Sequence, residues 1–214
     1  MSAQAGVFIV FEGGDGVGKT TQVERLCSWL TDRGREVVRT FEPGDSRLGA
    51  LIRQLVLDPL TGDLSPRAEA LLYAADKAHH LYELVEPALG RGAVVVCDRY
   101  VDSMLAYQGA GRVLHPDELE PIARWATQDR RPDLTVLLDL DPVRAVQEKV
   151  DKDRLEAAGE LFHQRVRHSF LELAARAPER YLVLDARLSR ETIANRIAAR
   201  VGRLLSEPSG TLGA

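Results

Sequence analysis

The chain has 214 residues, and its 28 lysines and arginines against 32 aspartates and glutamates give a formal charge of −4 at pH 7. This acidic balance argues against a basic segment that binds nucleic acid, so we expect no nucleic-acid polymer as a partner. Hydrophobic residues at 45% and charged residues at 28% are typical of a folded globular protein and exclude a disordered chain.

The chain length fits a single domain, 1–214, with a tail from about residue 206 that is small and polar enough to fray. Its two cysteines, Cys27 and Cys97, lie in separate apolar stretches without a metal-binding motif, which indicates reduced thiols. The chain begins without the charged start of a signal peptide, and no run approaches the roughly 18 apolar residues of a membrane span. We therefore expect a cytoplasmic protein without a membrane partner.

Short apolar runs alternate with amphipathic stretches along the chain. The runs predict β-strands at residues 7–12, 36–41, 93–98, 134–140 and 181–185. Apolar residues at helical spacing follow the first strand at Val23, Leu26, Cys27 and Leu30, and recur near the end at Ile193, Ile197, Val201 and Leu204. Ser65 followed by Pro66 predicts the start of a long helix towards Leu89. The alternation predicts an α/β fold, in which a parallel sheet of about five strands carries helices on both faces.

The first predicted strand leads into the strongest motif of the sequence, which fits the phosphate-loop pattern G-x-x-x-x-G-K-[ST] and precedes an amphipathic helix. Backbone N–H groups of such a loop bind phosphate, the lysine reaches the outer phosphates of ATP, and the hydroxyl after it can ligate Mg²⁺. A chance glycine-rich turn is the alternative, but the strand-loop-helix context disfavours it. The predicted ATP phosphate site comprises Gly13, Gly14, Asp15, Gly16, Val17, Gly18, Lys19, Thr20 and Thr21.

Charged residues follow the third and fourth predicted strands. Asp98 and Arg99 emerge at the same sheet edge as the phosphate loop, where Asp98 can serve Mg²⁺; a surface ion pair is the alternative. After the fourth strand, Asp141 before Pro142 is better explained as a helix cap. The charged residues 153–156 that follow are typical of a solvated helix face.

If two phosphorylated nucleotides must meet in the site, charge balance limits the kinds of reaction that the residues can support. Two phosphate groups about 4 Å apart repel by several kcal/mol at an effective dielectric constant near 20, which is more than one lysine can offset. Mg²⁺, Lys19, Arg99 and Arg154 together would supply the positive charge that phosphoryl transfer needs. A phosphate acceptor is already anionic and needs no general base. The chain has no N-K-x-D motif for guanine, which weakens a GTPase interpretation.

The order and spacing of seven segments resemble the thymidylate kinase family, P-loop nucleoside monophosphate kinases that transfer the terminal phosphate of ATP to dTMP. The segments are 11–21 (FEGGDGVGKTT), 42–44 (EPG), 71–77 (LLYAADK), 98–103 (DRYVDS), 106–109 (AYQG), 131–134 (RPDL) and 153–156 (DRLE). The resemblance covers nearly the whole chain. It implies a P-loop NTPase-type fold, a lid near residues 142–158 that closes over ATP, and a homodimer.

The resemblance also implies residue roles. The catalytic set would be Lys19, Asp15, Arg99 and Arg154. The dTMP site would comprise Asp15 at the 3′-hydroxyl, Arg99 at the phosphate, Tyr73 against thymine, Tyr107 at the 2′ position, and Glu42, Lys77, Ser103 and Gln108. Metal-side ligands would be Thr20, Asp98 and Glu156. The chain departs from the family at Lys77, where an arginine is usual. The compact ammonium of lysine therefore replaces the planar guanidinium of arginine.

Two alternatives stay open at this point. A deoxynucleoside kinase of the same fold would need a carboxylate base beside a sugar hydroxyl, for which Asp98 is the obvious candidate. A P-loop switch protein would bind and slowly hydrolyse nucleotide without any monophosphate site. Activity towards thymidine, or indifference to dTMP, would separate these alternatives from a dTMP kinase.

Overall fold

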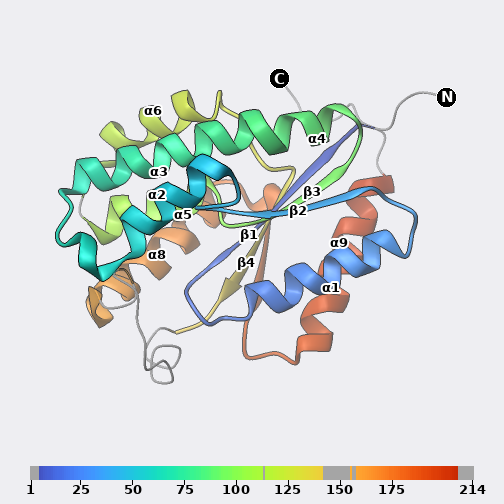
Figure 1. Cartoon of the computed structure of the whole chain (residues 1–214). Coiled ribbons are helices and arrows are strands. Elements are labelled where there is room, and N and C mark those ends of the chain that lie inside the picture. The colour runs from blue at the N-terminus through green and yellow to red at the C-terminus, as the bar shows by residue number, and fades with distance from the viewer. Residues whose placement is uncertain (1–4, 113, 142–154, 156–157, 207–214) are drawn as a thin grey trace.

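The computed structural model describes residues 5–112, 114–141, 155 and 158–206, and their strands form one sheet (Figure 1). All five strands are parallel and lie in the order β2-β3-β1-β4-β5. Their bounds are β1 (Val7–Gly13), β2 (Val37–Phe41), β3 (Val94–Asp98), β4 (Leu134–Asp139) and β5 (Tyr181–Asp185). The predicted strands and the α/β class are confirmed, with each strand end within one residue of its expected position.

Helices cover both faces of the sheet (Figure 1). The helices are α1 (Lys19–Thr31), α2 (Arg47–Leu57), α3 (Pro66–His80), α4 (Glu86–Gly90), α5 (Val101–Met104), α6 (Pro116–Ala126), α8 (Glu160–Arg176) and α9 (Arg190–Ser206). Two π-helical segments, Leu81–Val85 and Leu105–Gly111, continue α3 and α5. None of the described helices is long and apolar enough to cross a bilayer.

Alternating side chains of β1 separate two parts of the core, as expected for a strand covered on both faces. Ile9 and Phe11 pack with α1 and α9, whereas Phe8 and Val10 pack with the segment 81–88. A third cluster joins α2, α3, α6 and α8. The helix predicted from Ser65 begins at that residue, whose hydroxyl accepts from the Ala68 N–H. Helical structure then continues through the π-helical segment to Gly90. Residues that follow β1, β2 and β3, among them Asp15, Glu42 and Arg99, line one cavity.

Candidate active site

The phosphate loop connects β1 to α1. Gly18 is the N-cap of α1 with φ at 92°, a left-handed conformation that a side chain would strain. Gly13 has φ at 134°, and a Cβ there would collide with the carbonyl oxygen of Leu138. The loop glycines therefore allow the tight turn that the motif predicted, and the backbone N–H groups at the start of α1 supply an anion-binding terminus.

Lys19 is buried in the loop without a direct carboxylate contact among the described residues. Its Nζ donates to the carbonyl oxygens of Gly13 at 3.1 Å and Gly14 at 2.6 Å. Burial and then the charge of Arg99 lower the pKa of Lys19 to about 8, although nearby carboxylates oppose the shift. A phosphate would supply the negative charge that the carbonyl groups do not.

Thr20 and Asp98 meet beside the loop, as the sequence predicted. The Thr20 hydroxyl donates to Asp98 Oδ2 at 3.4 Å. The second oxygen, Asp98 Oδ1, is buried and has no hydrogen-bond partner among the described residues. No group of three metal-binding side chains occurs in the described ranges. A hydroxyl beside a carboxylate with an unsatisfied oxygen fits Mg²⁺, which takes few protein ligands and completes its shell with phosphates and water.

Arg99 lies at the centre of the site in an uncommon backbone conformation, with φ at 72°. Its Nη2 donates to Asp15 Oδ1 at 2.6 Å, and its Nη1 donates to Gly13 O at 3.1 Å and to Ser103 Oγ at 3.0 Å. The Tyr107 hydroxyl donates to the other Asp15 oxygen at 3.1 Å. Burial would raise the pKa of Asp15, but Arg99 and Lys19 outweigh it and hold that pKa well below its usual range. Asp15 is therefore a carboxylate that accepts from two partners.

Glu12 is a buried carboxyl group whose role the sequence did not reveal. Its Oε1 accepts from the N–H groups of Tyr100 at 2.8 Å and Ser103 at 3.1 Å, and its Oε2 accepts from the Ser103 hydroxyl at 2.6 Å. Burial and then the charge of Asp102 raise the pKa of Glu12 to about 7. Glu12 thus anchors the start of α5 and, through Ser103, the guanidinium of Arg99.

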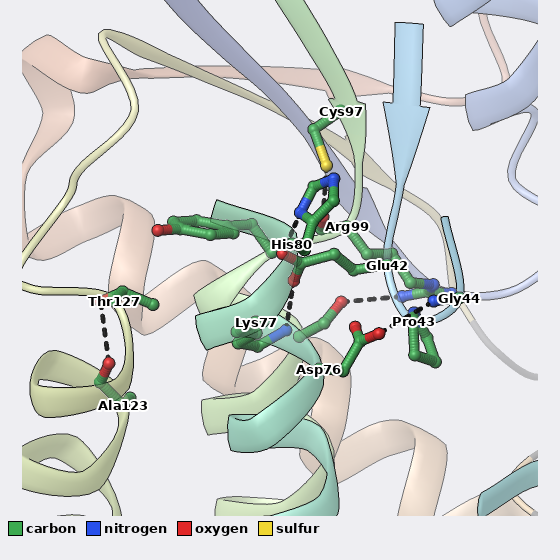
Figure 2. A network of polar contacts seen from close by, with 12 residues as sticks. Glu42, Pro43, Gly44, Asp76, Lys77, His80, Cys97, Arg99, Ala123 and Thr127 are labelled. Atoms are coloured by element: carbon green, nitrogen blue, oxygen red, sulfur yellow. Dashed lines mark hydrogen bonds and ion pairs between the residues drawn. The ribbon is translucent and has the colours of Figure 1, made fainter. Parts of the chain in front are cut away.

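Glu42, at the end of β2, meets Lys77 and His80 from α3 in a buried cluster (Figure 2). Lys77 Nζ donates to Glu42 Oε2 at 2.6 Å, and His80 Nδ1 lies 2.7 Å from Glu42 Oε1. All three side chains are at most 2% exposed. Burial would raise the pKa of Glu42, but Lys77 and His80 outweigh it and lower that pKa. Sequence analysis identified Glu42 and Lys77 but not His80, which follows Lys77 by one helical turn.

Most of these groups, but not Glu12 or His80, line one cavity of about 710 Å³, a volume in the usual range for ligand sites. It brings together Asp15, Lys19, Thr20, Thr21, Glu42, Tyr73, Lys77, Asp98, Arg99, Ser103, Tyr107 and Gln108, all of which sequence analysis singled out. Arg39, Arg53 and Arg190 also line it and were not expected. Gln108 donates to Glu69 at 3.0 Å, which fixes its amide group.

Some predictions lie outside the described residues. These are the predicted lid cation Arg154, the metal-side Glu156, and the helix that Asp141 was expected to cap from residue 142. The predicted fraying from about residue 206 concerns a tail that is also outside them, apart from Ser206 at the end of α9.

The fold and the cavity define a P-loop α/β nucleotide-binding protein. Residues 11–197 match the family model for thymidylate kinase. The chain is 60% identical to a thymidylate kinase of Cutibacterium acnes, over 94% of this chain and 98% of the relative, and 56% identical to one of Clavibacter sepedonicus, over 94% and 97%. A crystal structure of thymidylate kinase from Ehrlichia chaffeensis superposes with a TM-score of 0.74 at 28% identity, covering 92% of this chain and 99% of that one.

The chain belongs to the thymidylate kinase family. The expected activity is thereby confirmed: the protein is a dTMP kinase whose substrates are ATP and dTMP. The deoxynucleoside kinase and switch interpretations give way to this assignment.

Proposed function

We propose that phosphoryl transfer from ATP to dTMP takes place in the cavity between the phosphate loop and Arg99. The observation that carries this proposal is the carbonyl oxygen of Gly13, which accepts from both Lys19 Nζ and Arg99 Nη1 at 3.1 Å. Two cations from different elements therefore lie close together at the loop. One can bind the transferred phosphate of ATP and the other the phosphate of dTMP, which brings two anions together against their repulsion.

Arg99 and Asp15 would exchange partners when dTMP binds. The planar fork of Arg99 suits a phosphate, which would take the place of Asp15 as its partner. Asp15 would then accept from the sugar 3′-hydroxyl. The ring of Tyr107, held through its hydroxyl by Asp15, would occupy the space that a 2′-hydroxyl needs. Because the acceptor phosphate is already anionic, the residues have only to position the reactants and stabilise charge.

The base would lie against Tyr73, with Lys77 donating to thymine O4. An aromatic ring under a base contributes on the order of 1–3 kcal/mol but tolerates any base, so selectivity needs the polar contact. Glu42 holds the Lys77 ammonium at 2.6 Å, which supports a fixed donor at that end of the cavity. Ser103 and Gln108 line the same space. Lys77 and Tyr73 lie one turn apart on the same face of α3, and both line the cavity.

Mg²⁺ would be held by Thr20 and Asp98 together with ATP phosphates, and Glu156 would provide a further carboxylate on the side of the metal. Bound there, the ion neutralises phosphate charge. The unsatisfied Asp98 Oδ1 supports this assignment. Asp98→Asn should raise the Mg²⁺ concentration needed for half-maximal activity, with Asp133→Asn, at the opposite end of the sheet, as the control. An unchanged Mg²⁺ requirement would remove Asp98 from the metal site.

We further propose a cytoplasmic homodimer whose single domain carries a lid near 142–158, with Arg154 as its cation. Support for the dimer comes from α2 and α3, which expose a stripe of leucines between 43% and 58% accessible: Leu48, Leu51, Leu55 and Leu71. Such an apolar stripe is suited to a second copy. Leu51→Asp should yield monomers in sedimentation velocity, and Leu161→Asp, at an exposed residue of α8, should not. A monomeric parent protein would refute the dimer.

A coupled assay tests the whole assignment. It compares dTMP, dUMP, thymidine, AMP and GMP as acceptors at saturating ATP, and we expect dTMP to have the highest kcat/KM. Replacing Arg99 should raise the KM for dTMP far more than the KM for ATP. Phosphorylation of thymidine by the parent, or an equal effect of Arg99 on both substrates, would overturn the proposed placement.

A further inference from the structure

A chain of five polar side chains runs from the cavity to the partly exposed Asp45 in the loop after β2. Lys77 contacts Glu42 Oε2, and His80 Nδ1 contacts Glu42 Oε1 (Figure 2). On the far side of the ring, His80 Nε2 lies 2.6 Å from the hydroxyl oxygen of Thr40, and that oxygen lies 2.6 Å from Asp45 Oδ2. Thr40, Glu42, Lys77 and His80 are all at most 2% exposed. Water therefore does not compensate for a missing partner at these four side chains, whereas Asp45 is partly exposed.

Counting protons along the chain determines the state of the histidine. The Glu42 carboxylate only accepts, because Lys77 and His80 keep its pKa low despite burial, so His80 Nδ1 must donate. Thr40 has one hydroxyl proton, and it donates that proton to the carboxylate of Asp45. With Asp45 ionised, the oxygen of Thr40 is then an acceptor for His80, so Nε2 donates too. A ring that donates from both nitrogens is an imidazolium.

Charge balance agrees with this count. With His80 as an imidazolium, Lys77 and His80 would carry two positive charges against the two negative charges of Glu42 and Asp45, so these five side chains would be neutral together. The other titratable groups that act on this chain are Asp76 on α3, Cys97 on β3, Glu12 on β1, and Tyr100 and Asp102 at the start of α5. Burial, followed by the charge of Glu42, raises the pKa of Asp76 to about 6, so Asp76 adds a further negative charge above that pH.

We propose that His80 is a positioning residue for recognition of the acceptor base: as a buried imidazolium it occupies one oxygen of Glu42 and so restricts Lys77 to the other. This inference rests on the proposed function, in which Lys77 donates to the base. Among the described residues, Lys77 Nζ donates one side-chain hydrogen bond, to Glu42, out of three available N–H groups. Without His80, both oxygens of Glu42 would bind the ammonium and turn it away from the cavity.

The consequence is selectivity between pyrimidines. Thymine presents a carbonyl oxygen at position 4, whereas cytosine presents an amino group there. An ammonium can only donate, so a correctly placed Lys77 favours dTMP over dCMP, and a displaced one does not. The ratio of kcat/KM for dTMP to that for dCMP therefore reports the position of Lys77, and a general loss of folding or catalysis would leave this ratio unchanged.

The protonation state can be measured on the unaltered protein. In the ring ¹⁵N spectrum of histidine-labelled protein at pH 7, His80 should show two protonated nitrogens, with its signals assigned by their loss in His80→Asn. Thr40→Val removes the acceptor of Nε2 and should convert the ring to a neutral form protonated at Nδ1 only. A neutral ring in the parent protein, which would place the proton on Asp45 instead, overturns the inference.

Two variants test the positioning role. His80→Asn keeps an N–H donor at the site of Nδ1, whereas His80→Leu keeps the volume and loses both donors. We expect His80→Leu to raise the KM for dTMP about tenfold and to lower the dTMP to dCMP ratio by a similar factor, with kcat little changed. His80→Asn should recover most of both effects. His79→Asn, a change at the neighbouring histidine that is ion-paired with Glu83 on the surface, is the matched control and should behave as the parent.

Lys77→Met separates a failure of this inference from a failure of the proposed function. If Lys77→Met lowers the dTMP to dCMP ratio but His80→Leu does not, the role of His80 is refuted and that of Lys77 stands. If Lys77→Met leaves the ratio unchanged, Lys77 does not contact the base and both proposals fail. Equal losses for dTMP and dCMP in His80→Leu would also refute the positioning role.

Discussion

The phosphate loop (residues 13–21) and the proposed acceptor wall (Glu42, Tyr73, Lys77, Arg99 and Tyr107) hold their cations in different ways. Lys19 donates to two carbonyl oxygens of its own loop. Arg99 and Lys77 instead each contact a carboxylate, at 2.6 Å in both cases. The loop is one continuous segment, whereas the wall is assembled from α3, from the π-helical segment after α5, and from the residues that directly follow β2 and β3.

This difference indicates which residues affect catalysis alone and which also affect the stability of the fold. Removing the ammonium of Lys19 leaves backbone carbonyls, which other donors can satisfy. Removing one member of a buried ion pair leaves an uncompensated charge, which is far more costly. We therefore expect changes in the loop to act on chemistry, and changes in the wall to act on substrate selection and folding together. Four predictions test this contrast.

The largest expected effect is on the loop. Lys19→Met should lower kcat about 100-fold or more, because the charge that stabilises the transferred phosphate is lost, while the free energy of unfolding changes little. Steady-state kinetics and urea unfolding measure the two quantities. Arg25→Met, on the same helix, is the control. A kcat close to that of the parent would show that the loop does not hold the reacting phosphate.

Glu12, which contacts Tyr100 and Ser103 next to Arg99, should make the free energy of unfolding depend on pH. Its folded pKa of about 7 is above the ordinary value of 4.5, so the folded state binds the additional proton between these values. The stability that this proton contributes is present below pH 4.5 and is lost as the pH rises through 7. Glu12→Gln keeps the neutral form and should therefore become more stable than the parent by about 3 kcal/mol at pH 8, with a much smaller difference at pH 4.5.

Urea unfolding at the two pH values measures the Glu12 difference. Glu24→Gln, at an exposed residue of α1, should show no such pH dependence. A difference that stays constant from pH 4.5 to 8 would mean that Glu12 is ionised throughout in the folded protein.

Arg99→Lys should lower kcat/KM for dTMP by about 10- to 100-fold, because one ammonium cannot reproduce the fork that contacts Asp15, Gly13 and Ser103. The KM for ATP should change much less. Initial rates at varied dTMP and saturating ATP measure the effect. If the loss is shared equally between the two substrates, the contrast between loop and wall does not hold at Arg99.

The smallest expected effect concerns Tyr107. Tyr107→Phe loses the hydrogen bond to Asp15 and should lower kcat/KM for dTMP only a few-fold, because the bulk of the ring remains. Tyr107→Ala should instead relax the preference for deoxyribonucleotides, measured as the kcat/KM ratio of dTMP to its ribose counterpart. Comparable rates for both sugars in the parent would remove Tyr107 from this role.

Much of the site could be predicted because its chemistry is local in the chain. The loop residues Gly13 to Thr21 are contiguous, and their order alone indicates phosphate binding. Asp98 and Arg99 directly follow a strand, and carboxyl ends of parallel strands share one edge. Glu12, Thr40 and His80 were missed because a single polar residue has no pattern of its own. Apart from Asp45, which lies five residues from Thr40, their partners are 38 or more residues away in the chain, which spacing does not reveal.

The amino-acid sequence by itself determined the alternation of strands and helices, the phosphate loop and the family, because these depend on periodicity and on contiguous motifs. Only the tertiary structure decided which charges meet: Arg99 with Asp15, Lys77 with Glu42, and His80 between Glu42 and Thr40. Burial is the physical reason. A charge in water needs no particular partner, whereas a charge removed from water is stable only where the fold places an opposite charge or a donor within hydrogen-bond distance.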